Sequence, residues 1–322
     1  MDGVTVAAAG RPVIEASSLS RRFGETVAVD DLSIGIHRGE VFGILGHNGA
    51  GKTTFLRLVN GLLRPTAGTI TTFGGPAYET GPSIRARTGV VTESTSLDDF
   101  LTIRESLVAY GTMAGLPFGR IHERVDALLE IFELTPIADN QVRELSAGMR
   151  QRAAFARGLV HEPELLLLDE PTANMDPVAA RQVRHIVADT ARQTGRTVVI
   201  STHNLAEAQD ICDRIAVLRR GRLQALGTMT QLSRLVTRGA GTVTLTTGRG
   251  QGASAMKVAQ GYGRATIDGL PDVVTIHGAN VERIPALVAE LVHADVSVRG
   301  VSESVPTLED VYLALHQQRD GA

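Results

Sequence analysis

The sequence predicts an α/β fold in which a largely parallel sheet is covered on both faces, followed by a small α+β domain. Two observations support this expectation. Short apolar runs alternate with helical patterns over the first two thirds of the chain, and the character changes after Leu232. Strands that are apolar on both sides belong to sheets buried on both faces, which are typically parallel. The 322 residues are enough for one large core and a smaller second one.

The expected strands are bounded by glycine and charged residues. Val13–Phe23 and Val27–Ile36 alternate well enough to form an antiparallel pair. Five further runs are short and apolar enough to be buried strands: Val41–Leu45, Thr88–Val91, Leu165–Asp169, Thr197–Ser201 and Ile215–Leu218. Helical patterns lie between these strands at Lys52–Gly61, Ile103–Ala114, Ile121–Phe132, Ala147–Val160, Pro177–Thr194 and Leu205–Asp213.

Two breaks in this rhythm predict the domain boundaries. Residues from about 93 to 150 are mostly helical and lack a clear strand, which indicates an inserted helical subdomain. After Leu232, glycine-rich turns are followed by strand and helix patterns at Thr242–Thr247, Val273–His277, Val281–His293, Val296–Val301 and Thr307–Leu315. We therefore expect an N-terminal tail at 1–12, a main domain at 13–232 and an accessory α+β domain at 233–322.

The composition excludes several classes of protein. With a net charge of −3, the chain has no positive electrostatic field that would attract nucleic acid. Its aromatic content of 4% leaves few side chains on which bases could stack. Cys212 is the single cysteine, so no internal disulfide is expected. Neither a signal peptide nor an apolar run of membrane-spanning length is visible. If the protein takes part in transport, we expect another chain to cross the bilayer.

The strongest motif is the run from Gly46 to Thr53, which matches G-x-x-x-x-G-K-[ST] between an expected strand and an expected helix. Glycines let several backbone N–H groups face one anion, and a helix N-terminus adds its dipole. Lys52 is one of only two lysines in the chain and would contact the β- and γ-phosphates, while Thr53 would offer a hydroxyl to Mg²⁺. The probability that a chain of this length matches the motif G-x-x-x-x-G-K-[ST] somewhere by chance is roughly one in a hundred.

A second motif lies at the end of the apolar strand Leu165–Asp169. Asp169 and Glu170 would project from the carboxyl edge of the parallel sheet, beside the phosphate-binding loop. Asp169 suits a Mg²⁺ ligand, and Glu170 suits a general base that polarises an attacking water. A solvated acidic turn is the plain alternative, and the presence of Lys52 upstream disfavours it.

The segment Leu145-Ser146-Ala147-Gly148-Met149 resembles the signature of the ATP-binding subunits of ABC transporters, with Ala147 in place of the commoner glycine. On its own it would be an ordinary helix cap. The resemblance implies a P-loop NTPase core of ABC type with an antiparallel β subdomain and a helical subdomain, covering about Val13 to Leu232. It also implies a D-loop acid at Asp176, a switch histidine at His203 and an adenine-stacking aromatic at Phe23, for which a core position is equally plausible.

The site expected from the motifs and the resemblance has three parts. The catalytic residues are Glu170 and His203, and the Mg²⁺ ligands are Thr53, Glu93 and Asp169. The nucleotide-binding residues are Phe23, Gly46, His47, Asn48, Gly49, Ala50, Gly51, Lys52, Thr53, Thr54, Ser146, Ala147, Gly148 and Asp176. Glu93 departs from the family, which usually has glutamine there; a carboxylate can still approach Mg²⁺ but adds negative charge near the phosphates.

The resemblance also implies partners and a mechanism. Each ATP, bound with Mg²⁺, would lie between Lys52 of one subunit and Ser146 of a second copy or a sister subunit, at the cytoplasmic face of the membrane. The C-terminal run Pro306–Tyr312 resembles subunits of ABC-2 type exporters, which include drug and antibiotic efflux systems, and implies a separate multi-span permease. The alternatives are a soluble ABC ATPase acting on nucleic acid or ribosomes, which would need a basic surface and a second ATPase set, and a regulator with little turnover.

Overall fold

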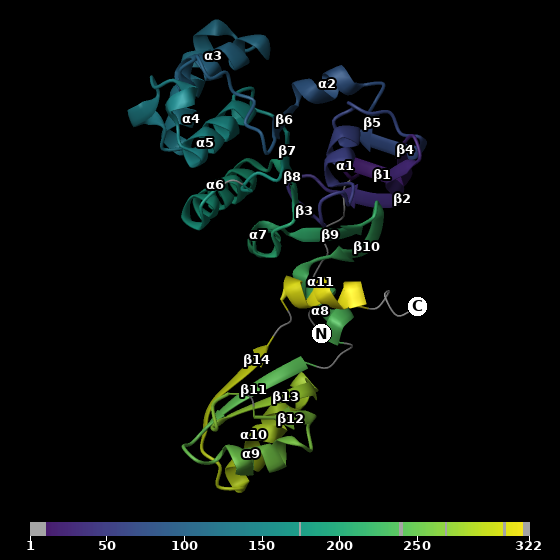
Figure 1. Ribbon diagram of the computed structural model, residues 1–322, viewed down its shortest axis with the longest axis vertical. Coiled ribbons are helices and arrows are strands. Elements are labelled where there is room, and N and C mark those ends of the chain that lie inside the picture. Colours follow the sequence, from purple (N-terminus) through teal and green to yellow (C-terminus); the bar gives the residue numbers. More distant parts are fainter. Residues whose placement is uncertain (1–10, 174, 238–240, 268, 305–306, 318–322) are drawn as a thin grey trace. The chain divides into compact units, whose positions relative to one another are not determined.

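The computed structural model describes residues 11–173, 175–237, 241–267, 269–304 and 307–317. The chain divides into two compact units, Met1–Thr228 and Met229–Ala322 (Figure 1). The first unit contains two sheets and most of the helices, and the second contains a four-stranded sheet of its own.

The central sheet of the first unit has the strand order β10-β9-β3-β8-β7-β6. All neighbouring strands are parallel except β10, which pairs antiparallel with β9. The strands are β3 (Val41–Leu45), β6 (Thr88–Val91), β7 (Leu165–Asp169), β8 (Thr197–Thr202), β9 (Arg214–Arg219) and β10 (Arg222–Gly227). The α/β fold predicted from the apolar runs is therefore confirmed.

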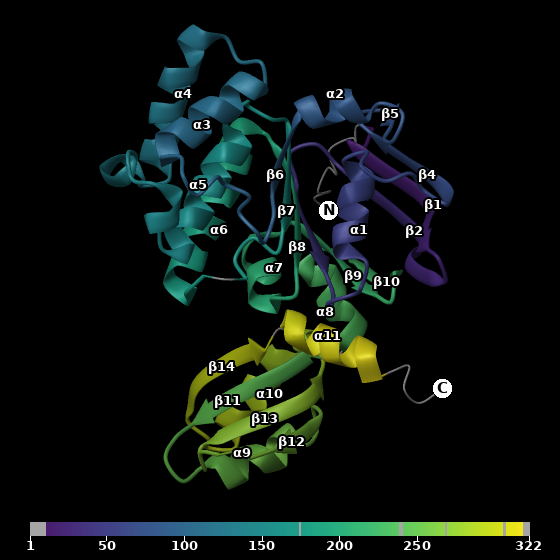
Figure 2. The same ribbon diagram turned by 45° about the horizontal axis from the view of Figure 1, so that its top comes forward.

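The strands β3, β7 and β8 each supply side chains to two separate cores, which explains their continuous apolar sequences. In β7, Leu166 and Leu168 pack into one cluster, whereas Leu165 and Leu167 pack into the other. Figure 2 shows the layers that form these cores on either side of the sheet. On one side lie α3 (Ile103–Met113), α4 (Phe118–Ile131), α5 (Ala147–Leu159), α6 (Pro177–Thr194) and α7 (Leu205–Ile211).

On the other side of the central sheet lie α1 (Lys52–Val59), α2 (Gly81–Ala86) and a second, antiparallel sheet. This sheet has the order β2-β1-β4-β5 and consists of β1 (Ile14–Phe23), β2 (Thr26–Ile36), β4 (Ala67–Thr72) and β5 (Gly75–Pro76). The β1–β2 pair was expected from its alternation. The strands β4 and β5 were not, because in β4 only Ile70 and Thr72 are buried, so the apolar signal is weak.

The second unit is an antiparallel sheet with helices, as the α+β pattern predicts. Its strand order is β12-β13-β11-β14, from β11 (Gly241–Thr247), β12 (Arg264–Thr266), β13 (Val273–Ala279) and β14 (Val298–Ser304). Val243, Leu245 and Leu287 belong to its own buried cluster. The helices are α8 (Met229–Thr237), α9 (Gly252–Ala259), α10 (Ile284–His293) and α11 (Leu308–Gln317); α8 and α11 pack against each other.

Candidate nucleotide site

The loop between β3 and α1 has a backbone that requires glycine at two positions. Gly51 has a φ of 101°, and a Cβ there would lie 2.2 Å from the carbonyl oxygen of Ala28. A Cβ on Gly46 would lie 2.6 Å from the carbonyl oxygen of Leu218. Because any other side chain would collide with backbone, the glycines of the motif fix a tight loop that leads directly into the N-terminus of α1. Such a loop presents N–H groups to an anion.

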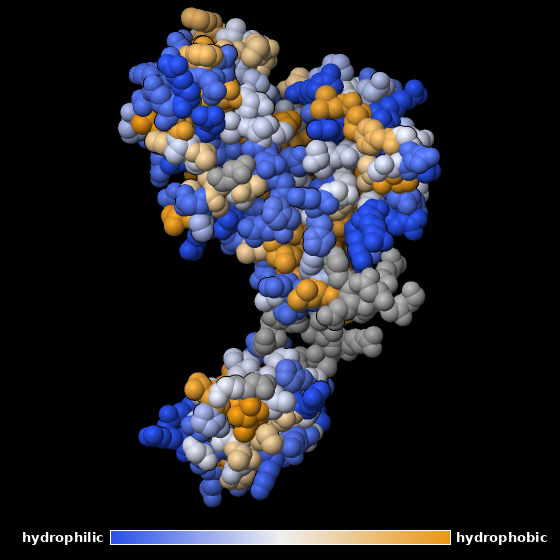
Figure 3. All heavy atoms as spheres, in the orientation of Figure 1, coloured by the Kyte–Doolittle hydropathy of each residue, from blue (hydrophilic) through white to orange (hydrophobic). Residues whose placement is uncertain are grey.

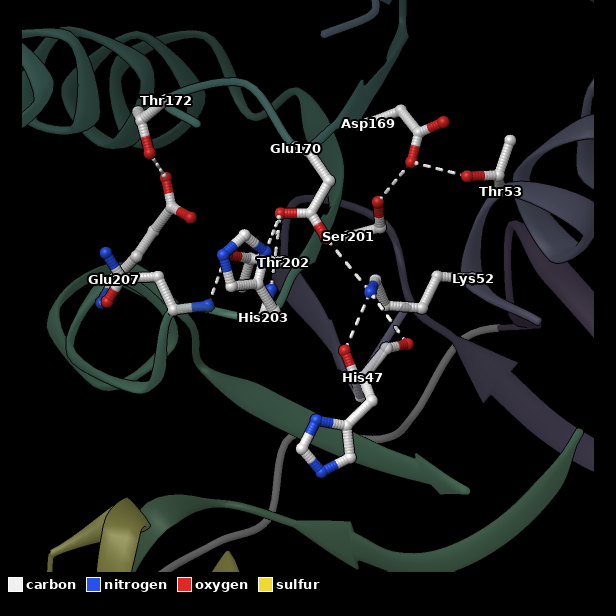
Figure 4. Close-up of polar contacts among 12 residues, drawn as sticks. His47, Lys52, Thr53, Asp169, Glu170, Thr172, Ser201, Thr202, His203 and Glu207 are labelled. Carbon is white, nitrogen blue, oxygen red and sulfur yellow. Dashed lines mark hydrogen bonds and ion pairs between the residues drawn. The ribbon is translucent and has the colours of Figure 1, made fainter. Parts of the chain in front are cut away.

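Lys52 is buried at the start of α1 and points back into this loop (Figure 4). Its ammonium nitrogen donates hydrogen bonds to the carbonyl oxygens of Gly46, at 2.7 Å, and His47, at 3.3 Å. The same nitrogen lies 2.9 Å from Oε1 of Glu170, and both side chains are largely buried. The lysine is therefore held at the mouth of the phosphate-binding loop by the two carbonyl groups and the ion pair.

Asp169 lies at the carboxyl end of β7, where it accepts two hydroxyl hydrogen bonds (Figure 4). Its Oδ1 atom is 3.0 Å from Oγ1 of Thr53 and 2.5 Å from Oγ of Ser201. The hydroxyl of Thr53 and the carboxylate of Asp169 lie next to each other, as two Mg²⁺ ligands would. This ion is usually bound by one or two protein oxygens together with substrate phosphates. Among the described residues there is no cluster of three or more histidine, cysteine or acidic side chains that would hold an ion by itself.

Glu170 and His203 form a close pair beside Lys52. Oε2 of Glu170 lies 2.7 Å from Nδ1 of His203 and accepts a 3.3 Å hydrogen bond from the backbone N–H of His203. Glu170 has a φ of 50°, a left-handed conformation that is strained for a non-glycine residue. Its backbone N–H donates to the carbonyl of Ser201, which anchors the strained residue to β8. The carboxylate of Glu170 therefore points toward the ammonium group of Lys52.

Lys52, Thr53, Asp169 and Glu170 line a cleft of about 440 Å³. The expected residues that line it are His47, Asn48, Gly49, Ala50, Gly51, Lys52, Thr53, Thr54, Glu93, Asp169 and Glu170. The sequence did not predict Thr26, Val27 and Ala28, which also line the cleft. These residues come from the β1–β2 pair, and their sequence carries no motif that would have identified them.

Phe23 is not among the residues that line the cleft. It ends β1, its ring is 44% exposed, and the guanidinium of Arg21 lies 4.5 Å from the ring centre. An exposed ring next to the strand that borders the cleft is compatible with stacking on a base, and this role of Phe23 stays a prediction.

The signature segment is exposed and lies outside the cleft. Ser146 is the N-cap of α5, and its hydroxyl accepts a 3.3 Å hydrogen bond from the backbone N–H of Met149. Ser146 and Ala147 are exposed, and Gly148 is half-buried. Asp176 similarly caps α6 by accepting hydrogen bonds from Val178 and Ala179, and its neighbour Asn174 lies outside the described residues. Within one chain, the signature segment and Asp176 therefore do not join Lys52 at the cleft.

The sequence also missed a buried pair behind the catalytic candidates. The hydroxyl of Thr172 donates a 2.8 Å hydrogen bond to Oε1 of Glu207, and both side chains are buried. Glu207 is buried on α7 together with Ala208 and Ile211, and no motif in the sequence marked it as part of the site.

Comparisons of the sequence with known proteins find similar chains. A sequence model described as ABC transporter matches residues 29–173. The chain is 41% identical over 218 residues to Nod factor export ATP-binding protein I of Cupriavidus pinatubonensis, covering 67% of this chain and 66% of that protein. It is 40% identical over 219 residues to the protein of the same name from Ralstonia nicotianae, covering 67% of each.

Solved structures give the same picture of the fold. The model resembles cbiO1 of Clostridium perfringens, part of the ABC transporter complex cbiONQ, with a TM-score of 0.64 and 28% identity, covering 71% of this chain and 94% of that one. It also resembles MJ0796, a bacterial ABC transporter cassette solved as a dimer, with a TM-score of 0.61 and 25% identity, covering 67% of this chain and 98% of that one.

Proposed function

This chain belongs to the ABC transporter family as an ATP-binding and ATP-hydrolysing subunit, and from this premise we propose that it drives export of a small molecule by a separate membrane-spanning permease. The observation that carries the proposal is that Lys52 and Glu170 form an ion pair in the lining of one cleft. Thr53 and Asp169 line the same cleft, and His203, which is not part of the lining, lies 2.7 Å from Glu170. These groups together can hold a triphosphate and activate a water.

We propose that ATP is bound between two protomers. Lys52 and the phosphate-binding loop line the cleft, whereas Ser146 lies at the exposed N-terminus of α5 and does not reach it. A helix N-terminus with a free face favours a phosphate group, so the signature segment of a second protomer is suited to cover the γ-phosphate. The structure of MJ0796, which was solved as a dimer, supports this view. The partner would be a second copy of this chain or a sister subunit.

In the proposed reaction, each residue of the cleft has a separate task. Lys52 holds the β- and γ-phosphates, and Glu170 accepts the proton of the attacking water. His203, which lies 2.7 Å from Glu170, orients the carboxylate and contacts the γ-phosphate. Mg²⁺, held with the nucleotide by Thr53 and Asp169, would neutralise charge on the phosphates, and Glu93 lines the cleft where it can sense the ion.

A membrane partner is proposed because the relatives are named as export proteins, and export needs a chain that crosses the bilayer. No described helix of this chain is long and apolar enough to do so. The helical part of the first unit exposes large apolar side chains, among them Phe100, Met113 and Phe118. Figure 3 shows hydrophobic residues gathered at the tip of this part amid a largely hydrophilic surface. We propose that the segment Glu93–Leu107 transmits closure of the two protomers to the permease, with the chain bound at the cytoplasmic face of the membrane.

The direction of transport is proposed from the relatives, which are named as proteins of Nod factor export. The cargo of this chain is proposed to be a drug, antibiotic or lipid-like compound, and side chains of the permease would select it.

The proposal is tested by purifying the chain from membranes of its own host. We expect Mg²⁺-dependent phosphate release from ATP and co-purification of a multi-span membrane protein whose presence changes the rate. Hydrolysis that responds to RNA or ribosomes, without a membrane partner, would instead support the soluble alternative.

A further inference from the structure

Glu207 is a buried acid that the mechanism above does not use. It is 0% exposed, and its Oε2 atom has no hydrogen-bond partner in the described structure. Burial raises the pKa of the carboxyl group, while the neighbouring hydroxyl groups of Thr202 and Thr172 partly oppose this effect. Acids are almost never fully buried unless they are paired, because removing them from water costs free energy. A residue of this kind at the back of an active site therefore calls for a specific explanation.

The contacts of Glu207 join the two segments that carry the proposed catalytic pair. Thr172, which donates a 2.8 Å hydrogen bond to Oε1 of Glu207, lies two residues after Glu170 (Figure 4). Thr202, whose hydroxyl is close enough to the same carboxyl group to lower its pKa, lies directly before His203. Glu207 thus contacts the turn after β7 and the end of β8 from one position on α7.

Glu207 is itself held in place by the cap of its helix. The side chain of Asn204, the N-cap of α7, accepts a 3.2 Å hydrogen bond from the backbone N–H of Glu207. The backbone N–H of Asn204 in turn donates to the hydroxyl of Thr202 at 2.9 Å. The backbone of Glu207 is therefore tied to the residues next to His203, so that its side chain has little freedom to move away from the two threonines.

The segment from Glu170 to Thr172, which Glu207 contacts, has a strained backbone at Glu170. Glu170 has a φ of 50°, and such a conformation persists only where the surrounding structure fixes it. The carboxylate of Glu170 is 2.7 Å from Nδ1 of His203, a spacing that depends on the relative placement of the two segments. A contact to Thr172 from outside the loop is suited to maintain that spacing.

We propose that Glu207 is a positioning residue for ATP hydrolysis, which fixes Glu170 relative to His203 through Thr172 and Thr202. This inference rests on the proposed roles of Glu170 and His203. In its protonated form, the carboxyl group can accept a hydrogen bond from one threonine and donate one to the other. An amide at this position can do the same, so charge on Glu207 is not required.

The test compares Glu207→Ala with Glu207→Gln in the full-length chain. We expect Glu207→Ala to lower kcat for ATP roughly 10- to 100-fold, since small displacements of catalytic groups have effects of that size. The ATP dissociation constant should stay within about threefold, because Lys52 and the phosphate-binding loop do not contact Glu207. Glu207→Gln should retain kcat within about threefold, because the amide oxygen can still accept the hydrogen bond from Thr172 and the amide N–H can donate to Thr202.

A matched control separates positioning from packing. Ile211 lies on the same helix and is buried in the core. Its aliphatic side chain packs there but cannot form a hydrogen bond with Thr172 or Thr202. Ile211→Ala should lower the melting temperature at least as much as Glu207→Ala while leaving kcat near that of the wild type, when both are assayed well below their melting temperatures. Thr172→Val keeps Glu207 but removes its hydrogen bond and should reproduce the loss of kcat. If Glu207→Ala does not fold, this second variant tests the positioning role instead.

Several outcomes would overturn the proposal. An unchanged kcat in Glu207→Ala or in Thr172→Val would do so, as would an equal loss of kcat in Ile211→Ala or a loss of ATP affinity alone. Failure of Glu207→Gln to retain activity would also contradict it. Glu170→Gln, assayed in parallel, distinguishes this failure from a failure of the proposed function, because normal hydrolysis by Glu170→Gln would mean that Glu170 is not the base.

Discussion

Nζ of Lys52 lies 2.9 Å from Oε1 of Glu170, so the residue proposed to hold the phosphates and the residue proposed to activate water form an ion pair. A triphosphate carries more negative charge than one carboxylate and should draw the ammonium group toward itself. Glu170 would then keep His203 as its neighbour, at 2.7 Å, and face the attacking water. The pairing of these two residues therefore links nucleotide binding to the activation of the base.

Glu170→Gln is expected to bind ATP but to hydrolyse it roughly 10²- to 10³-fold more slowly, because the amide cannot accept the proton of the attacking water. Its affinity for ATP should be equal or higher, since a negative charge next to the γ-phosphate is removed. Steady-state phosphate release and an equilibrium binding titration measure both effects. Glu79→Gln, at an exposed glutamate outside the cleft, should behave as the wild type. Rapid hydrolysis by Glu170→Gln would exclude this residue as the base.

Lys52→Ala is expected to raise the ATP dissociation constant by at least about tenfold, because a buried charge that contacts the phosphates is lost. Lys52→Arg should also bind poorly, since a planar guanidinium does not fit the space between the carbonyl groups of Gly46 and His47. Titration with a fluorescent ATP analogue measures these affinities.

The chain provides a control for this experiment. Lys257 is the other lysine and is exposed on α9 in the second unit. Lys257→Ala should leave the dissociation constant unchanged. If Lys52→Ala and Lys257→Ala bind ATP equally well, Lys52 does not hold the phosphates.

Glu93→Gln is expected to increase the Mg²⁺ concentration needed for half-maximal hydrolysis several-fold, because a carboxylate that lines the cleft attracts the cation and the amide does so less. The measurement is a Mg²⁺ titration of the ATPase rate at saturating ATP. Asp98→Asn removes an acid from the same loop outside the cleft and should have no effect. Identical rates and identical Mg²⁺ curves for Glu93→Gln and the wild type would show that Glu93 does not sense the metal.

His161 is expected to make stability depend on pH. Burial lowers the pKa of its ring, the neighbouring Arg196 lowers it further, and a 3.1 Å contact between Nε2 and the carbonyl of Thr88 opposes both effects. The unfolded chain, with a histidine pKa of about 6.5, takes up the proton first as the pH falls. The contribution of His161 is therefore present above this pH and is lost as the pH falls toward the lower pKa of the folded state.

His161→Gln removes this titration and keeps an N–H donor for Thr88. We expect the free energy of unfolding of the wild type to fall relative to that of the variant between about pH 7.5 and about pH 5.5. Denaturant unfolding at both pH values provides the comparison, and His122→Gln, at an exposed histidine on α4, is the control. Parallel pH curves for the wild type and His161→Gln would contradict the expectation.

The sequence predicted those parts of the fold and site whose signal is local. The apolar run of β7 indicated a sheet with two buried faces, and Gly46–Thr53 indicated the phosphate-binding loop. Thr26, Val27 and Ala28 of β2 were missed because no motif marks them as part of the cleft. The contact between Thr172 and Glu207 was missed because it joins residues that are 35 positions apart and have no shared motif.

The central claim is that Ser146 and its neighbours on one protomer cover the nucleotide that Lys52 of another protomer holds. Sedimentation velocity of Glu170→Gln, with and without saturating ATP and Mg²⁺, tests this claim most directly. We expect the protein to change from the mass of one chain to twice that mass when ATP is added, and we expect the additional substitution Ser146→Glu to prevent the change. A Glu170→Gln protein that binds ATP and stays monomeric, or that forms the same dimer with Ser146→Glu present, would contradict the claim.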